Sequence, residues 1–351
     1  MISAPPKPAS TTAPVLDLTA LEREALVSAL TRRKLFTAAA AIAALGATGT
    51  LAQSTPIAGE WPRTLQGTFG EVVIPAKPVR IVAASDWYEV DYLIAMGVKP
   101  ILYCYTNRYD LGVSPWLIAA GGDTLEHYDI IDNPDLERIV AANPDLIVAD
   151  PAVAEEVAEP LKKIAPTLGL PTPYTGSKDW REAQILLGQA CGTETEAAAA
   201  IAETEAAIAS GKDRLAAYSD RSVTILYSYG PTGNIYGTGE DESVAGLFRT
   251  LGVQFSSPFS GSAQSTELIG EAKNADILFN WDIWGSPEFL EANDVFQTLP
   301  AVQEGRYEVL SGPAARAIFG PTTLSIRWVI DELVEKIILA ANSNGKRLPT
   351  S

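Results

Sequence analysis

The chain has 351 residues, of which 43 are acidic and 26 basic, and its net charge is −17. Neutralising phosphates requires clustered Lys and Arg, so this charge argues against a nucleic-acid partner. The composition includes 1 histidine and 2 cysteines, which excludes zinc or manganese sites built from several histidines and a framework of several disulfides.

The N-terminal segment has the pattern of an export signal. Arg32 and Arg33 precede an Ala-rich apolar run over residues 37–47, and residues 50–52 offer a small-residue cleavage site. The run is about half the roughly 20 residues that span a bilayer. We therefore expect residues 1–52 to be a disordered lead followed by a twin-arginine export signal, and the mature protein to work in the periplasm. An uncleaved membrane tether is the alternative.

The two cysteines and the histidine give no sign of a reactive site. Neither Cys104 nor Cys191 lies at the end of the signal, where a lipid-bearing Cys would be, so a free protein is expected rather than a lipid-anchored one. Two separate buried thiols are favoured over one bridge, which an oxidising compartment would permit. His127 has no neighbouring nucleophile or base and is expected at the surface or in a loop.

Short apolar runs rich in β-branched residues alternate with helical patterns through the rest of the chain. This alternation predicts parallel sheets built from βαβ units. The predicted strands are Glu71–Ile74, Val79–Ala84, Pro100–Tyr105, Asp145–Ala149, Val223–Tyr229, Ile277–Asn280 and Tyr307–Leu310. The predicted helices are Tyr88–Met96, Leu136–Ala142, Val153–Ile164, Trp180–Ala190, Ser243–Leu251, Thr266–Lys273 and Pro321–Ala341.

One long helix is predicted over residues 193–218. The segment is dense in Ala and Glu, and it opens with Thr193 and Glu196 in the spacing of a capping box. At about 1.5 Å per residue its length is roughly 39 Å, enough to join two domains. Ile201, Ile208 and Leu215 form its apolar stripe. The predicted organisation is therefore a first lobe over 61–192, a bridging helix over 193–219 and a second lobe over 220–345. The alternative is a long helix within one domain.

The two predicted lobes contain matching segments. In each, a short helix carries a glutamate in its first turn, Glu137 or Glu267, and an Asx-rich turn then leads into a buried strand. The two lobes therefore look like imperfect copies of one plan.

The chain resembles a known family over about residues 64–340. The resemblance rests on an ordered set of segments, which are 64–68, 74–82, 93–100, 136–139 with 143–147, and 299–302 with 305–307. They are similar to the periplasmic solute-binding proteins of ABC importers for iron–siderophore complexes and cobalamin. The family implies two Rossmann-like α/β lobes with parallel sheets, bridged by one rigid α-helix.

The resemblance also implies partners and roles. A member of this family would be no enzyme, would need no cofactor, and would be a monomer that delivers its cargo to a permease dimer in the inner membrane. Glu137 and Glu267 match the glutamates with which the family meets permease arginines. A helix N-terminus tolerates such a carboxylate, and stabilising its own helix is the alternative role of each.

The cargo site is predicted in the loops after the strands, because ligands of open α/β sheets bind beyond the carboxyl ends of the strands. Aromatic walls suit a large, partly apolar chelate, and arginines suit its oxygen ligands. The predicted cargo-binding residues are Trp87, Tyr105, Arg108, Tyr229, Tyr236, Trp281, Trp284 and Arg316.

The predicted cargo is an iron(III)–siderophore complex. The alternatives are cobalamin or haem in the same role, and direct binding of a metal ion, which the single histidine disfavours. A redox enzyme that bridges a metal cluster would need more cysteine ligands than the 2 present.

Overall fold

The computed structural model describes residues 60–85, 88–105, 112–129, 133–150, 155–171, 179–229, 232–283, 285–343 and 345. These residues fall in one compact unit, Ser54–Ser351. The predicted export signal lies outside the described residues, as do three of the predicted cargo-binding residues, Trp87, Arg108 and Trp284. Within the described ranges, no helix combines the length and the apolar character that a membrane span requires.

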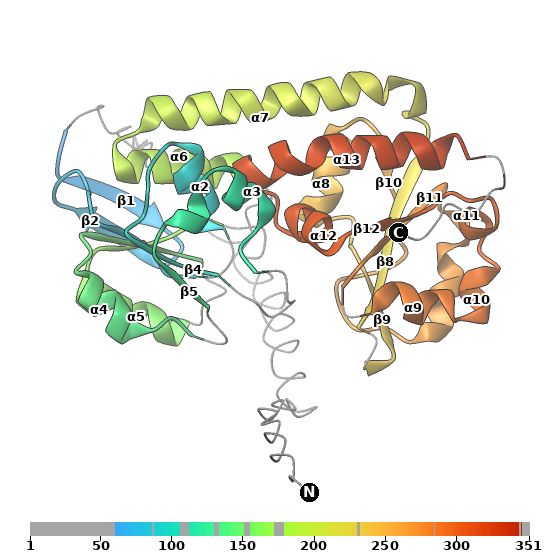
Figure 1. The fold of residues 1–351 in the computed structure, drawn as a ribbon, viewed down its shortest axis with the longest axis horizontal. Helices are drawn as coiled ribbons and strands as arrows, with labels where there is room; N and C mark the ends of the chain where they lie inside the picture. Colours follow the sequence, from blue (N-terminus) through green and yellow to red (C-terminus); the bar gives the residue numbers. More distant parts are fainter. Residues whose placement is uncertain are drawn as a thin grey trace, which may run out of the picture. The chain divides into compact units, whose positions relative to one another are not determined.

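The first lobe combines an antiparallel hairpin with a five-stranded parallel sheet (Figure 1). The hairpin pairs β1 (Arg63–Gly67) with β2 (Gly70–Ile74). The strand order of the sheet is β5-β4-β3-β6-β7. Its strands are β3 (Ile81–Ala83), β4 (Leu102–Tyr105), β5 (His127–Asp129), β6 (Leu146–Ala149) and β7 (Thr167–Gly169).

The second lobe repeats this plan. Four strands run parallel in the order β10-β8-β11-β12, and β9 pairs antiparallel with β8. The strands are β8 (Ser222–Tyr229), β9 (Asn234–Gly237), β10 (Gln254–Phe255), β11 (Ile277–Trp281) and β12 (Tyr307–Leu310).

Helices connect and cover the strands. The first lobe contains α2 (Glu89–Ala95), α3 (Pro115–Ala119), the 3-10 turn η2 (Gly122–Thr124), α4 (Leu136–Ala142), α5 (Glu155–Ile164) and α6 (Trp180–Cys191). In chain order, α7 (Glu194–Arg214) and the 3-10 turn η3 (Ala216–Tyr218) follow the first lobe and precede the second. The second lobe contains α8 (Ser243–Thr250), the 3-10 helix η5 (Thr266–Asn274), α9 (Ser286–Glu291), α10 (Asp294–Gln297), α11 (Pro300–Gln303), α12 (Gly312–Phe319) and α13 (Thr323–Ala341).

The predicted fold class is confirmed. Every residue of β3, β6 and β11 is buried, as expected of parallel strands whose two faces are both covered. All seven predicted strands occur, with small shifts at their ends. The strands β1, β5, β7, β9 and β10 were not predicted. Of these, β5, β7 and β10 have only 2 or 3 residues, too few to show periodicity. The lobe boundaries at residues 192 and 220 stay predictions.

The long helix forms as predicted, but its cap does not. Thr193 precedes α7 without a capping hydrogen bond from its side chain, which instead lies 3.5 Å from Met96 Sδ. The capping box is therefore wrong, because the hydroxyl contacts the first lobe. Ile208 and Leu215 are buried, as the apolar stripe predicts. At Gly211 a Cβ would lie 3.0 Å from Leu251 Cδ2, so the glycine allows close packing on the second lobe.

Three local expectations also change. The predicted helix at Thr266 is a 3-10 helix, and the last predicted helix starts at Thr323 after the separate α12. His127 lies half-buried on β5 and not in a loop, because its ring stacks on Tyr103 at 5.1 Å. Cys104 and Cys191 are both buried and are not bridged to each other, which confirms two separate thiols.

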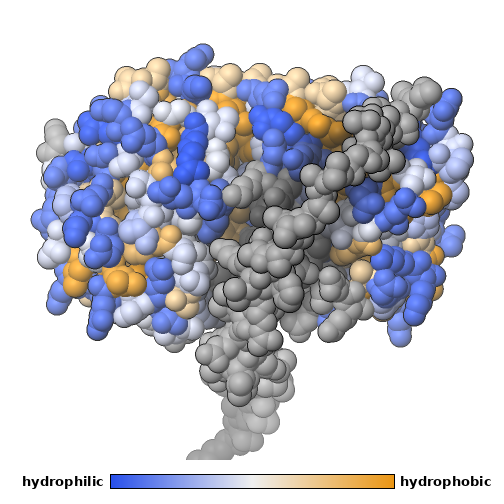
Figure 2. All heavy atoms as spheres, turned by 180° about the vertical axis from the view of Figure 1, so that it is seen from behind, coloured by the Kyte–Doolittle hydropathy of each residue, from blue (hydrophilic) through white to orange (hydrophobic). Residues whose placement is uncertain are grey.

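On the face drawn in Figure 2, hydrophilic residues alternate with small apolar patches, consistent with the net charge of −17. The pale upper edge corresponds to the Ala-rich α7, which also lies along the top of Figure 1.

Candidate functional site

The predicted cargo-binding residues that the structure describes lie at strand ends and on α12. Tyr105 ends β4, Tyr229 ends β8 and Trp281 ends β11, while Tyr236 lies within β9. These positions agree with the rule that open α/β sheets bind ligands beyond the carboxyl ends of their strands. Whether the residues bind cargo stays a prediction.

In the second lobe these positions form a row of aromatic rings. Tyr236 stacks on Tyr227 with centroids 5.6 Å apart, and Tyr227 stacks on Trp281 at 4.4 Å. Phe319 of α12 meets Trp281 edge-on at 5.2 Å. Trp281 and Tyr227 are buried, whereas Tyr236 and Phe319 at the two ends of the row are half-buried.

Tyr227 was missed in the sequence, although it points to the same part of the sheet as Tyr236. The two residues are register partners in the antiparallel pair of β8 and β9. Cross-strand partners have neighbouring side chains. The neighbourhood of Tyr227 and Tyr236 follows only from β9 and its register with β8, and β9 was not predicted.

The row includes one unsatisfied polar atom. The indole Nε1 of Trp281 is buried and has no hydrogen-bond partner among the described residues. A buried donor without a partner is costly, so it is a natural anchor for an acceptor or a water molecule. Trp281 thus contributes a buried donor, and the partly exposed aromatic surface comes from Tyr236 and Phe319.

In the first lobe, buried carboxyl groups gather at the ends of β3 and β6. Ser85 Oγ donates a hydrogen bond to Glu89 Oε1, and the amide of Asp150 donates to Ser85 Oγ at 2.6 Å. Burial, together with the nearby Asp150 charge, raises the pKa of Glu89 well above its ordinary value. Glu89 was not singled out in the sequence, because a glutamate in the first turn of a helix ordinarily serves the helix dipole.

Arg316 and Tyr105 have contacts within the fold. Arg316 lies half-buried on α12, and its positive charge acts on the buried Asp91 of α2. Tyr105 is half-buried, and its ring meets His127 edge-on at 5.4 Å. Arginine can offer planar donors to the oxygens of a chelate.

The two repeated glutamates are exposed. Glu137 lies in the first turn of α4, where Asp135 caps the helix by accepting from the amide of Arg138 at 3.0 Å. Glu267 lies in the first turn of η5, where its amide donates to Ser265 Oγ at 3.3 Å. Each short helix directly precedes a central strand, β6 or β11.

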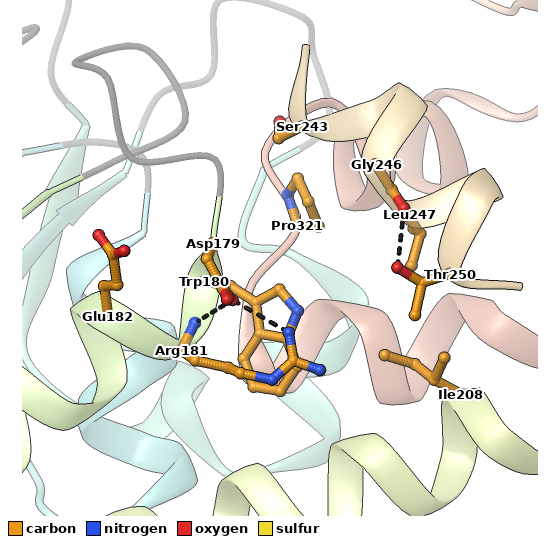
Figure 3. Close-up of a pocket in the computed structure, with 10 residues that line it drawn as sticks. All are labelled: Asp179, Trp180, Arg181, Glu182, Ile208, Ser243, Gly246, Leu247, Thr250 and Pro321. Atoms are coloured by element: carbon orange, nitrogen blue, oxygen red, sulfur yellow. Dashed lines mark hydrogen bonds and ion pairs between the residues drawn. The ribbon is translucent and has the colours of Figure 1, made fainter. Parts of the chain in front are cut away.

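A separate cavity of about 430 Å³ lies among α6, α7 and α8 (Figure 3). The Arg181 guanidinium lies over the Trp180 ring at 4.4 Å and pairs with Asp179 at 3.0 Å and with Glu205 at 2.7 Å. Of the predicted cargo-binding residues that the structure describes, none lines this cavity, so it is distinct from their strand ends. In the described part of the chain, no group of three or more His, Cys, Asp or Glu side chains could hold a metal ion.

The fold and the strand-end site define a class, the two-lobed α/β binding proteins. Residues 116–312 match the family model described as periplasmic binding protein, and the chain belongs to that family.

One relative and two solved structures are similar to this chain over most of its length. The ferric-anguibactin-binding protein FatB of Vibrio anguillarum is 26% identical over 300 residues, which cover 79% of this chain and 88% of FatB. A periplasmic solute-binding protein of Mycobacterium smegmatis superposes with a TM-score of 0.68 at 23% identity, covering 80% of this chain and 98% of that chain. PiaA of Streptococcus pneumoniae in complex with ferrichrome superposes with a TM-score of 0.66 at 23% identity, and the match covers 80% of this chain and 99% of PiaA.

Proposed function

We propose that this protein is the exported substrate-binding protein of an ABC importer. It binds an iron(III)–siderophore complex between its two lobes and delivers the complex to a membrane permease. The observation that carries the proposal is the two-lobed fold of the family, with aromatic residues at the strand ends of both sheets.

The chemistry of the strand ends suits such a cargo. A ferric chelate is large and presents both apolar surface and oxygen atoms. Tyr236 offers an aromatic face, and Arg316 offers a charged planar donor. The relative FatB is named for binding ferric anguibactin, which is a complex of this kind.

Delivery requires a docking surface for the permease. Glu137 and Glu267 are exposed, one on each lobe, in the first turns of the helices that precede β6 and β11. Two anionic side chains at a fixed separation can recognise arginines on a partner and report the spacing of the lobes. The carrier works as a monomer, holds no cofactor, and performs no chemistry on its cargo.

A binding titration tests the cargo. The purified protein is titrated against ferric catecholate, hydroxamate and carboxylate siderophores, cobalamin, haem and Fe(III) without chelator, with Trp fluorescence as the readout. At least one ferric siderophore should bind more tightly than about 10 μM, equivalent to roughly −7 kcal/mol. Binding of cobalamin or haem alone would transfer the role to that cargo, and binding of bare Fe(III) alone would replace it with metal capture.

A further inference from the structure

A buried carboxylate joins the two lobes. Asp91 lies on α2 of the first lobe and is 3% exposed. Its Oδ2 accepts a hydrogen bond from Thr322 Oγ1 at 2.8 Å and another from Trp116 Nε1 at 2.7 Å. Thr322 precedes α13 in the second lobe, whereas Trp116 lies on α3 in the first. One carboxylate oxygen therefore ties three helices from two lobes.

Thr322 also belongs to a local hydrogen-bond network at the start of α13. Its side chain caps α13 by accepting from the Ser325 amide at 2.9 Å, and its own amide donates to Ser325 Oγ at 2.9 Å. Ser325 Oγ donates in turn to the Ala317 carbonyl of α12 at 3.0 Å. The end of α12, the turn and the start of α13 are thus one unit, and Asp91 is attached to it.

Close packing reinforces the same joint. A Cβ at Gly320 would lie 1.8 Å from the hydroxyl oxygen of Tyr88, so the phenol ring lies directly against the glycine backbone. Tyr88 is buried and precedes α2. The rings of Trp116 and Trp328 meet at 5.4 Å, which adds a contact between α3 and α13. Close packing as well as hydrogen bonds therefore holds the turn between α12 and α13 against the first lobe.

This joint determines where a predicted cargo residue lies. Arg316 is on α12, close to Gly320 in sequence, and its charge acts on Asp91. We propose that Asp91 is a positioning residue, which holds the turn between α12 and α13 on the first lobe and so sets the lobe spacing and the place of Arg316. The part of this proposal that concerns cargo rests on the proposed function. The part that concerns lobe spacing does not.

The test separates the hydrogen bonds from the charge. Asp91→Ala removes the acceptor, whereas Asp91→Asn keeps one oxygen that can accept from both donors. Thr322→Asp keeps a good helix cap but replaces the donor with a second carboxylate that faces Asp91. This last variant is the safeguard if Asp91→Ala does not fold, because α13 retains its cap.

Lobe spacing is measured with spin labels on exposed sites of the full chain, at Lys163→Cys in the first lobe and Asp294→Cys in the second. The native cysteines are buried. The unsubstituted chain and Asp91→Asn should give one narrow distance distribution by pulsed EPR. Asp91→Ala and Thr322→Asp should broaden the distribution and lower the affinity for a ferric siderophore about tenfold, whereas Asp91→Asn should keep the affinity within about twofold.

Two results would overturn the proposal. The first is an unchanged distance distribution in both disruptive variants, and the second is an Asp91→Asn variant as broad as Asp91→Ala. If no ferric siderophore binds the unsubstituted chain, the proposed function fails, but the distance measurements still decide whether Asp91 sets the lobe spacing.

Discussion

Asp145 and Asp276 make equivalent contacts in the two lobes. Asp145 accepts hydrogen bonds from the amides of Val79 and Arg80 at 2.8 and 2.9 Å, directly before β3. Asp276 accepts from the amide of Ser222 at 2.9 Å, at the start of β8. Each carboxylate lies between a short helix and the strand that follows it, β6 or β11. It binds the backbone at the start of the neighbouring strand, β3 or β8. The internal repeat is therefore structural, and it brings Glu137 and Glu267 to corresponding places.

Charge reversal at these two glutamates should separate binding from delivery. In the double variant Glu137→Lys and Glu267→Lys, the affinity for a ferric siderophore should stay within about twofold, because both side chains are exposed and lie away from the strand ends. Uptake of the radiolabelled ferric siderophore by cells should fall to background. Glu271→Lys is the matched control, because it is also exposed on η5, and uptake should continue. A loss of affinity in the double variant would place the two glutamates in the cargo site.

Arg316 should contribute measurably to affinity. Arg316→Ala should weaken binding of a ferric siderophore by about 10- to 100-fold, since a hydrogen bond to a charged group contributes roughly 1.5–3 kcal/mol. Arg327→Ala is the control, because Arg327 lies on α13 and pairs with Glu203 of α7. Isothermal titration measures both. Equal affinities for the two variants would remove Arg316 from the site.

Tyr236 should matter through its ring and not through its hydroxyl. Tyr236→Phe should retain the affinity within about threefold, and Tyr236→Ala should lower it about tenfold, because an aromatic contact contributes roughly 0.5–1.5 kcal/mol beyond its buried area. Fluorescence titration of both variants provides the comparison. If Tyr236→Phe were as weak as Tyr236→Ala, the hydroxyl would be the interacting group.

The buried Asp91 should make stability depend on pH. Burial raises its pKa from 3.8 to about 6, and the hydrogen bonds from Thr322 and Trp116 and the charge of Arg316 oppose the shift. Because the folded state holds the proton more tightly, this contribution to stability is fully present below pH 3.8 and is lost as the pH rises to about 6. Tyr92 and Tyr103 also face Asp91, but they stay neutral in this range.

Asp91→Asn removes this titration and keeps an acceptor. Its free energy of unfolding, measured by urea denaturation from pH 4 to pH 7, should exceed that of the unsubstituted chain progressively more as the pH rises. A constant difference between the two chains over this interval would show that Asp91 does not titrate there.

Two glycine substitutions should have opposite effects on stability. Gly320→Ala would place its Cβ 1.8 Å from the Tyr88 hydroxyl oxygen, and the overpacking should lower the free energy of unfolding by about 1–3 kcal/mol or more. Gly246→Ala lies in α8 with nothing within 4 Å of its Cβ, and it should raise the free energy of unfolding by about 0.5–1 kcal/mol. Urea denaturation measures both free energies of unfolding. A Gly320→Ala variant as stable as the parent chain would contradict the close packing of Gly320 against the Tyr88 ring.

Much of the fold followed from pattern alone. Near-continuous apolar runs such as Ile277–Asn280 predict buried parallel strands because parallel sheets are covered on both faces, and β11 is buried throughout. The Ala- and Glu-rich segment predicts α7 because its residues favour helix wherever they lie. The family resemblance implied that Glu137 and Glu267 lie on the outer faces of their lobes, and both are exposed in the structure.

The site was less accessible from sequence. Tyr227 joins the aromatic row only through the register of β8 with β9, and Glu89 is notable only because folding buries it beside Asp150. The contact between Asp91 and Thr322 joins residues 231 positions apart. Composition, local propensity and periodicity are properties of neighbouring residues, so the sequence by itself determined the fold class, the long helix and the repeated glutamates. The register between strands, the burial of charge and the joint between the lobes depend on which distant segments pack together, and only the tertiary structure decided them.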